Sequence, residues 1–177
     1  EEIQHIIEDA LIAVIRSTDS ELVRQKALEA IGFSMREEVP ALIQNAFSSG
    51  NYEWIASALF AMGRSADAEK WGLDVLSMLA HPDNHVQREA IRAAGELELK
   101  QARKLLIKWI KETKADEAIW SESLWALSKI GGENLIDFFE NLLTNAETDE
   151  DEFFIQDALD NLLLTNDIAK GFELLDL

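Results

Sequence analysis

The chain has 177 residues, 47% of them hydrophobic, and it contains no cysteine. This length suits one domain or one compact array, and the hydrophobic content is too high for a disordered chain. The absence of cysteine excludes disulfides, thiolate nucleophiles and cysteine-based zinc sites, and no apolar run approaches the roughly 20 residues of a membrane span. The first residues lack the basic region and cleavage site of a secretory signal. The absence of cysteine fits a cytoplasmic protein, and the sequence predicts no membrane partner.

The net charge is −18, and the charges are unevenly distributed. Residues 1–87 carry 6 basic and 14 acidic side chains, residues 88–114 carry 8 and 4, and residues 115–177 carry 2 and 16. Proteins that bind nucleic acid draw much of their affinity from Lys and Arg placed against phosphates. The overall charge therefore argues against a nucleic-acid partner, whereas the central window predicts a local cationic patch.

A short helical pattern recurs five times along the chain. The copies are VRQKALEAIG (23–32), WIASALFAMG (54–63), VQREAIRAAG (86–95), IWSESLWALS (119–128) and FIQDALDNLL (154–163). A small residue stands at the same place in each copy, at spacings of 31, 32, 33 and 35 residues: Ala27, Ala58, Ala90, Ser123 and Ala158. A period in this range predicts an all-α solenoid of stacked helix pairs, in which the small residue lets helix backbones approach.

In chain order, each copy predicts a helix A, a tight turn, a helix B and a loop. An amphipathic helix at 3–15 comes first and is expected to be the B helix of a partial repeat, 1–17. The helix pairs are expected at about 19–32 and 37–47, 52–63 and 66–80, 84–97 and 99–114, 116–130 and 132–145, and 150–164 and 167–175. The repeats then span 19–50, 51–82, 83–115, 116–148 and 149–177, within a single domain of 1–177. Asp19 or Ser20 is expected to cap the first helix A, and Gly32 to end it as a C-cap glycine.

The stretches DSELVRQKALEAIG (19–32), DNHVQREAIRAAG (83–95) and VPALIQNAF (39–47) resemble HEAT repeats, in the short form of phycobilisome-lyase-type HEAT-like proteins. The usual helix A of that family reads Asp-x-x-Val-Arg-x-x-Ala-x-x-Ala-Leu-Gly, and here Gln87 replaces the arginine in the third copy. Ser128 and Leu163 replace the glycine in the last two copies. The resemblance covers nearly the whole chain and implies an armadillo-like α-solenoid. The alternative is another α-solenoid, although the Trp-x-x-Leu-Gly-x-x-Tyr signature of tetratricopeptide repeats is missing.

Helix B of the third repeat lies within KQARKLLIKWIKETK (100–114) and is strongly basic. Its cations are spaced mainly by three and four residues, so several share one helix face: Lys100, Arg103, Lys104, Lys108, Lys111 and Lys114. The resemblance implies that B helices line a concave groove, where this stripe would bind an acidic peptide, a phosphate or RNA. The alternative is a solvated face that neighbouring carboxylates neutralise, for which the candidates are Glu69, Asp74, Glu133 and Asp137.

The chain has five tryptophans, which we divide by position. Trp54 and Trp120 occupy apolar positions of A helices and are expected in the core, whereas Trp125 follows a small anchor and is left open. Trp71 and Trp109 lie on B helices. Because exposed tryptophan is enriched at binding hot spots, we expect these two as partner contacts, with simple packing as the alternative.

No other polar cluster predicts a catalytic residue, a metal or a cofactor. The acidic run 147–152 is favoured at a helix N-terminus by the helix dipole; the alternative is a docking patch for a basic partner or a divalent ion, although the glycine of a calcium loop is missing. Pro82 and Asp83 separate His81 from His85, which breaks the helical spacing of a two-histidine zinc site. No Ser-His-Asp elbow, phosphate-binding loop or dinucleotide fingerprint is present.

These observations predict a non-enzymatic scaffold that binds a protein with an acidic segment, through shape and charge complementarity. The expected partner-binding residues are Lys100, Arg103, Lys104, Lys108, Lys111, Trp71 and Trp109. Self-association through the apolar ends of the solenoid is a further expectation. Two alternatives come from the resembled family: a bilin lyase subunit that handles tetrapyrroles and phycobiliproteins, and a nucleic-acid binder like some HEAT-like DNA glycosylases, which the net charge disfavours.

Overall fold

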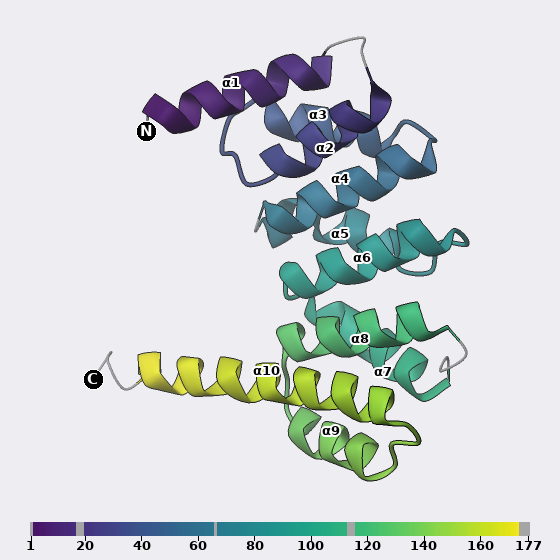
Figure 1. Ribbon diagram of the computed structural model, residues 1–177. Helices are drawn as coiled ribbons and strands as arrows, with labels where there is room; N and C mark the ends of the chain where they lie inside the picture. Colours follow the sequence, from purple (N-terminus) through teal and green to yellow (C-terminus); the bar gives the residue numbers. More distant parts are fainter. Residues whose placement is uncertain (1, 17–19, 66, 113–115, 174–177) are drawn as a thin grey trace. The chain divides into compact units, whose positions relative to one another are not determined.

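A computed structural model describes residues 2–16, 20–65, 67–112 and 116–173, with side chains up to Thr165 in the last range. Within these ranges the chain forms ten α-helices and one 3₁₀ helix, with no strand (Figure 1), so the predicted all-α class is confirmed. The chain divides into two compact units, Glu1–Ala93 and Ala94–Leu177, which are described separately. The prediction of a single domain stays a prediction.

The first unit contains α1 (Glu2–Arg16), α2 (Glu21–Ile31), α3 (Val39–Phe47), α4 (Tyr52–Arg64) and α5 (Ala68–Met78). Helix α6 (Asn84–Glu96) crosses the boundary between the units. The second unit continues with the 3₁₀ helix η1 (Lys100–Ala102), then α7 (Arg103–Glu112), α8 (Glu117–Ile130), α9 (Leu135–Thr144) and α10 (Asp149–Glu173).

Four of the B helices, α1, α3, α7 and α9, pack mainly against the A helix that follows each of them. In the first unit α1 lies on α2 and α3 on α4, while the A helices α2 and α4 lie side by side (Figure 1). The second unit repeats this arrangement, because α7 lies on α8, α9 lies on α10, and α8 contacts α10. Helix α2 has far fewer contacts with its own B helix, α3, than with α4. The core therefore lies between successive repeats.

The small anchors are all buried, with exposed fractions of 0 to 5%. The residue after each anchor is buried as well: Leu28, Leu59, Ile91, Leu124 and Leu159. Ser123 fits among the alanines because its hydroxyl donates a 2.6 Å hydrogen bond to the carbonyl oxygen of Ile119, four residues earlier. This hydrogen bond satisfies the buried hydroxyl, which therefore avoids the free-energy cost of a buried donor without an acceptor.

The glycines at the ends of the A helices have a different role from the one predicted. Gly32 has φ −52° and ψ −28°, which is ordinary right-handed helix and not the left-handed conformation of a C-cap glycine. A Cβ atom at Gly32 would lie 2.5 Å from the carbonyl oxygen of Ala61 in α4. At Gly95 it would lie 2.9 Å from the Cα atom of Ala126 in α8. Glycine is therefore required because consecutive A helices approach closely at this point.

Side chains cap several of the helix starts. The carboxylate or amide oxygens of four residues accept backbone N–H groups in the first turns of α4, α5, α6 and α8: Asn51, Asp67, Asp83 and Asp116. Ser20 precedes α2 without a side-chain hydrogen bond, and Asp19 lies outside the described residues.

The last repeat differs from the predicted helix pair. One continuous helix, α10, runs from Asp149 to Glu173, so the turn expected between 164 and 167 is wrong. The segment contains neither glycine nor proline at that place, and the Thr165 hydroxyl donates to the carbonyl oxygen of Asn161 at 2.9 Å, which leaves the helix unbroken. Residues 174 and 175 of the expected final helix lie outside the described residues.

Candidate protein-binding surface

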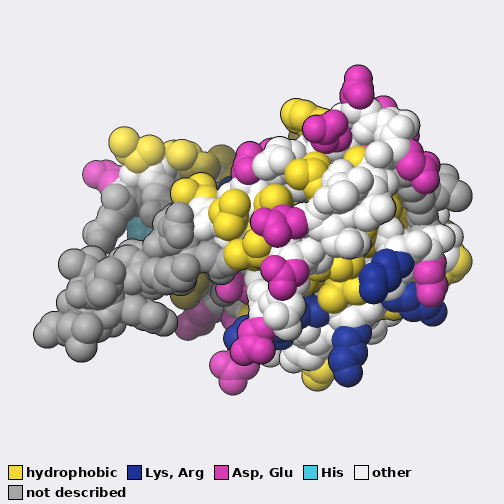
Figure 2. All heavy atoms as spheres, turned by 90° about the horizontal axis from the view of Figure 1, so that it is seen from below, with side chains coloured by type: hydrophobic (Ala, Val, Ile, Leu, Met, Phe, Trp, Pro, Cys, Tyr) yellow, Lys and Arg dark blue, Asp and Glu magenta, His cyan; other side chains and the backbone are white. Residues whose placement is uncertain are grey.

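Four lysines form one exposed face on η1 and α7, which we call the cationic face: Lys100, Lys104, Lys108 and Lys111. Their spacing of four, four and three residues brings them to the same side of a helix. Leu106 and Ile110 lie on the opposite side and are 0% and 3% exposed. The amphipathic pattern of α7 therefore buries one side in the second unit and directs the lysines into solvent. Figure 2 shows the Lys and Arg side chains gathered mainly toward one side of the face seen from below.

Among the described residues of the second unit, few carboxylates lie close to the lysines of the cationic face. Lys108 is 3.8 Å from the carboxylate of Glu112, but both side chains are more than 60% exposed, so this ion pair contributes little to stability. The Lys111 ammonium lies 5.6 Å from the centre of the Phe138 ring. Among the described residues no ion pair joins the four lysines to Glu133 or Asp137, the two carboxylates of this unit that the sequence suggested as neutralising partners.

Arg103 lies apart from the cationic face. It is half-buried, and a Cβ atom at Gly132 would lie 2.8 Å from its guanidinium carbon. The turn at Gly131 and Gly132, with φ of +62° and +144°, leaves the space that the guanidinium occupies. Arg103 therefore differs from the four lysines in burial, and its role in binding stays a prediction. Lys114 lies outside the described residues.

Of the two tryptophans expected as partner contacts, Trp71 is buried and Trp109 is half-buried. Trp71 is 2% exposed on α5 in the first unit, and the Lys70 ammonium lies 5.3 Å from its ring centre. Trp109 belongs to α7 in the second unit. Trp71 thus offers little ring surface to a partner in this conformation, and the partner-binding role of both residues stays a prediction.

The remaining three tryptophans belong to A helices: Trp54 to α4, and Trp120 and Trp125 to α8. Trp120 is 4% exposed, and its Nε1 donates to the carbonyl oxygen of Ile110 at 3.1 Å, so its predicted core position is confirmed. Trp54 is only half-buried, so its predicted core position is wrong; its Nε1 reaches the surface and donates to the carboxylate of the exposed Glu21 at 2.6 Å. Trp125 is half-buried beneath the Lys129 ammonium, 5.6 Å from its ring centre.

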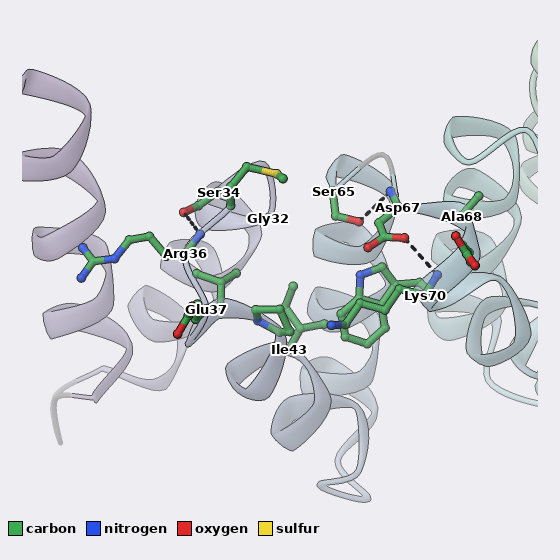
Figure 3. Close-up of a pocket in the computed structure, with 14 residues that line it drawn as sticks. Gly32, Ser34, Arg36, Glu37, Ile43, Ser65, Asp67, Ala68 and Lys70 are labelled. Atoms are coloured by element: carbon green, nitrogen blue, oxygen red, sulfur yellow. Dashed lines mark hydrogen bonds between the residues drawn. The ribbon is translucent and has the colours of Figure 1, made fainter. Parts of the chain in front are cut away.

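The first unit contains a recess of about 550 Å³ between the turn after α2 and the turn after α4 (Figure 3). Trp71, Val39 and Ile43 supply its apolar lining. Ser34 and Asp67 on its rim already bond locally: the Ser34 hydroxyl accepts the backbone N–H of residue 36 at 3.3 Å, and the Asp67 carboxylate accepts that of residue 70 at 3.0 Å. The sequence pattern does not predict this recess, because turn residues, which carry no periodic signal, form its rim.

Glu8 is a buried carboxylate on α1, and its side chain is 2% exposed. A 3.0 Å hydrogen bond from the amide of Gln4 lowers the pKa of Glu8 below 4.5, against the opposing effect of burial. Hydrogen bonding by Ser34 and the charges of His5 and Arg36 lower this pKa further. The ionised form therefore stabilises the fold above about pH 4.5, and this contribution is lost as the pH falls through the lowered pKa of the folded state.

We therefore expect Glu8→Gln to destabilise the protein in a pH-dependent way. The difference in free energy of unfolding between wild type and variant should be largest at neutral pH and should shrink below about pH 4.5. Urea denaturation from pH 7 to pH 3 measures it. Glu2→Gln, which removes an exposed carboxylate from the same helix, is the matched control. A difference for Glu8→Gln that stays constant across this range would contradict the assignment.

The histidines are engaged in local contacts. Nδ1 of His81 accepts the backbone N–H of Asp83 at 3.1 Å, and His85 lies 3.5 Å from the carboxylate of Glu53. Among the residues that the structure describes, no group of three or more His, Asp or Glu side chains is placed to hold a metal ion. In the same part of the chain, no helix has the length and apolarity needed to cross a membrane.

Comparison with known proteins supports the repeat architecture. The family model for HEAT repeats matches residues 72–161, a segment that contains all of α7, α8 and α9 and therefore the cationic face. No curated protein matches the chain. The narrower resemblance to phycobilisome-lyase-type repeats stays a prediction.

Proposed function

We propose that this chain, which belongs to the HEAT-repeat family, is a cytoplasmic, non-enzymatic scaffold that binds a partner protein through the cationic face of α7. Stacked helical repeats present extended surfaces, and HEAT repeats generally mediate protein–protein interaction. The second unit supplies such a surface from regular helix, so the lysines are held at defined spacing.

One observation carries the proposal: four exposed lysines stand on one side of η1 and α7 in a chain of net charge −18, without neutralisation by Glu133 or Asp137. A local positive face on an acidic protein selects an acidic segment of a partner, while the rest of the surface repels acidic molecules that lack a matching shape. Exposed charges interact over about 10 Å at 0.1 M salt, so binding should be salt-sensitive.

Charge reversal tests the proposal. Lys104→Glu with Lys108→Glu should weaken binding of a fluorescent, glutamate-rich helical peptide by about tenfold or more at 0.1 M salt, because each attraction becomes a repulsion. Fluorescence anisotropy measures the affinity.

The matched control reverses two other exposed lysines, Lys26→Glu with Lys70→Glu, which changes the net charge by the same amount. Equal weakening by both double variants would show that only net charge matters and would remove the cationic face from the proposal. No binding of the peptide by wild type would do the same.

A further inference from the structure

The outer face of α10 has the same residue spacing as the cationic face, with aspartate at three of the four positions. Asp149, Phe153, Asp157 and Asp160 follow one another at four, four and three residues, and all four are exposed. The opposite side of α10 is buried in the second unit through Ile155, Ala158 and Leu162, which are 0 to 2% exposed. We call this exposed side the acidic face; it extends beyond the first turn of the helix.

The two faces match in length as well as in charge. The stretches 104–111 and 153–160 are regular α-helix, and with a rise of 1.5 Å per residue each spans about 10 Å. Lys104, Lys108 and Lys111 therefore stand at the same intervals as Phe153, Asp157 and Asp160. Phe153 is 67% exposed and provides an apolar surface for the aliphatic stem of a lysine whose ammonium group reaches a carboxylate beside it.

Within one chain the faces do not meet. The acidic face lies opposite the side of α10 that packs on α8 and α9, and the cationic face lies opposite the buried side of α7. Among the described residues no ion pair connects the two. The Asp160 carboxylate accepts a hydrogen bond from Gln156, four residues earlier on the same exposed surface, at 2.7 Å.

We propose that the cationic face of one copy docks on the acidic face of a second copy. This inference rests on the binding site of the proposed function and names its partner. Such a contact joins two different surfaces, so it adds further copies in a row unless the rotation between them closes a ring. The net charge of −18 repels copies when screening is weak. Association is therefore greatest near 0.1 M salt, where the screening length is about 10 Å, and it is lost near 1 M, where it is about 3 Å.

Sedimentation velocity over a concentration series tests this contact with two exposed double variants. Lys104→Glu with Lys108→Glu removes the cationic face, and Asp157→Lys with Asp160→Lys removes the acidic face. Each variant alone should show an association constant lower by about tenfold or more than wild type at 0.1 M salt. An equimolar mixture of the two should regain association, as should one chain that carries all four substitutions, because opposite charges again face each other.

A wild type that stays monomeric at every salt concentration would overturn the inference, as would a mixture that fails to associate. Association by the Asp157→Lys, Asp160→Lys variant alone would overturn it as well. Circular dichroism of each variant checks that the helices are retained. Binding of the glutamate-rich peptide tests the proposed function independently of self-association. The Asp157→Lys, Asp160→Lys variant keeps the cationic face, so it should still bind this peptide. Peptide binding without self-association would leave the proposed function standing and remove only the second copy as partner.

Discussion

Replacing Gly32 by alanine should lower the free energy of unfolding by about 3 kcal/mol, the upper part of the range for overpacked cores. The added Cβ atom would stand 2.5 Å from the carbonyl oxygen and 2.8 Å from the Cα atom of Ala61. Both are backbone atoms of α4, which no side-chain rotation can move away. The intrinsic preference of alanine for helix over glycine, about 1 kcal/mol, offsets only part of this cost. The clash of the added Cβ atom with Ala61 can be relieved only if α2 and α4 move apart. That movement would weaken the packing of the buried Leu28 and Leu59.

Urea denaturation followed by tryptophan fluorescence measures the loss at Gly32, and Gly50→Ala is the matched comparison. Gly50 has φ of +73° and no atom within 4 Å of an added Cβ, so alanine there costs only the left-handed backbone strain of about 1–2 kcal/mol. A loss at Gly32 no larger than the loss at Gly50 would show that helix approach does not require the glycine. Hydrogen exchange should place the destabilisation in the first unit.

The repeat positions were predictable from the sequence because burial on a helix follows its period. Ala27, Ala58 and Ser123 recur at one place in the repeat, and any stacking of helices that shares a core must bury them. The role of Gly32 was not predictable in the same way. A glycine at the end of a helix fits either a left-handed cap or a close helix contact, and only the position of Ala61 distinguishes them.

The candidate site was predictable only where one helix determines it. The grouping of Lys104, Lys108 and Lys111 follows from the 3.6-residue period within α7. Arg103 belongs to the same segment, but its position depends on the Gly131–Gly132 turn, which lies about thirty residues later in the sequence. The burial of Trp71 depends on its surroundings in the fold, about which the local sequence pattern says nothing.

The continuous α10 departs from the helix pair that the earlier repeats predict. Homology between repeats predicted a helix pair in the last repeat, whereas local sequence contains no residue that ends the helix near Thr165. In earlier repeats a turn is marked locally, as at Gly131 and Gly132. At this place the repeat pattern predicts a turn, whereas the local sequence predicts a continuous helix, and the structure follows the local sequence. A helix continues unless a residue interrupts its hydrogen bonds or a tertiary contact bends it.

Replacing Trp71 by alanine should lower the free energy of unfolding by about 3–5 kcal/mol, the usual cost of truncating a fully buried tryptophan. The ring is 2% exposed, and its removal would leave a cavity in the first unit, next to the recess that it already lines. Thermal or urea unfolding of the variant measures this loss, and Trp71→Phe, which retains an aromatic ring, should lose clearly less.

The same variant distinguishes packing from partner contact at Trp71. If Trp71 acts through packing, the folded variant should bind the glutamate-rich peptide with unchanged affinity, because the cationic face lies on α7. A variant that keeps wild-type stability and loses binding would instead establish Trp71 as an anchor that the partner reaches by opening the first unit.

Trp109→Ala provides the comparison on α7 itself. Trp109 is only half-buried, so we expect a smaller loss of stability there than at Trp71. Any loss of peptide binding at unchanged stability would assign the Trp109 ring to the cationic face.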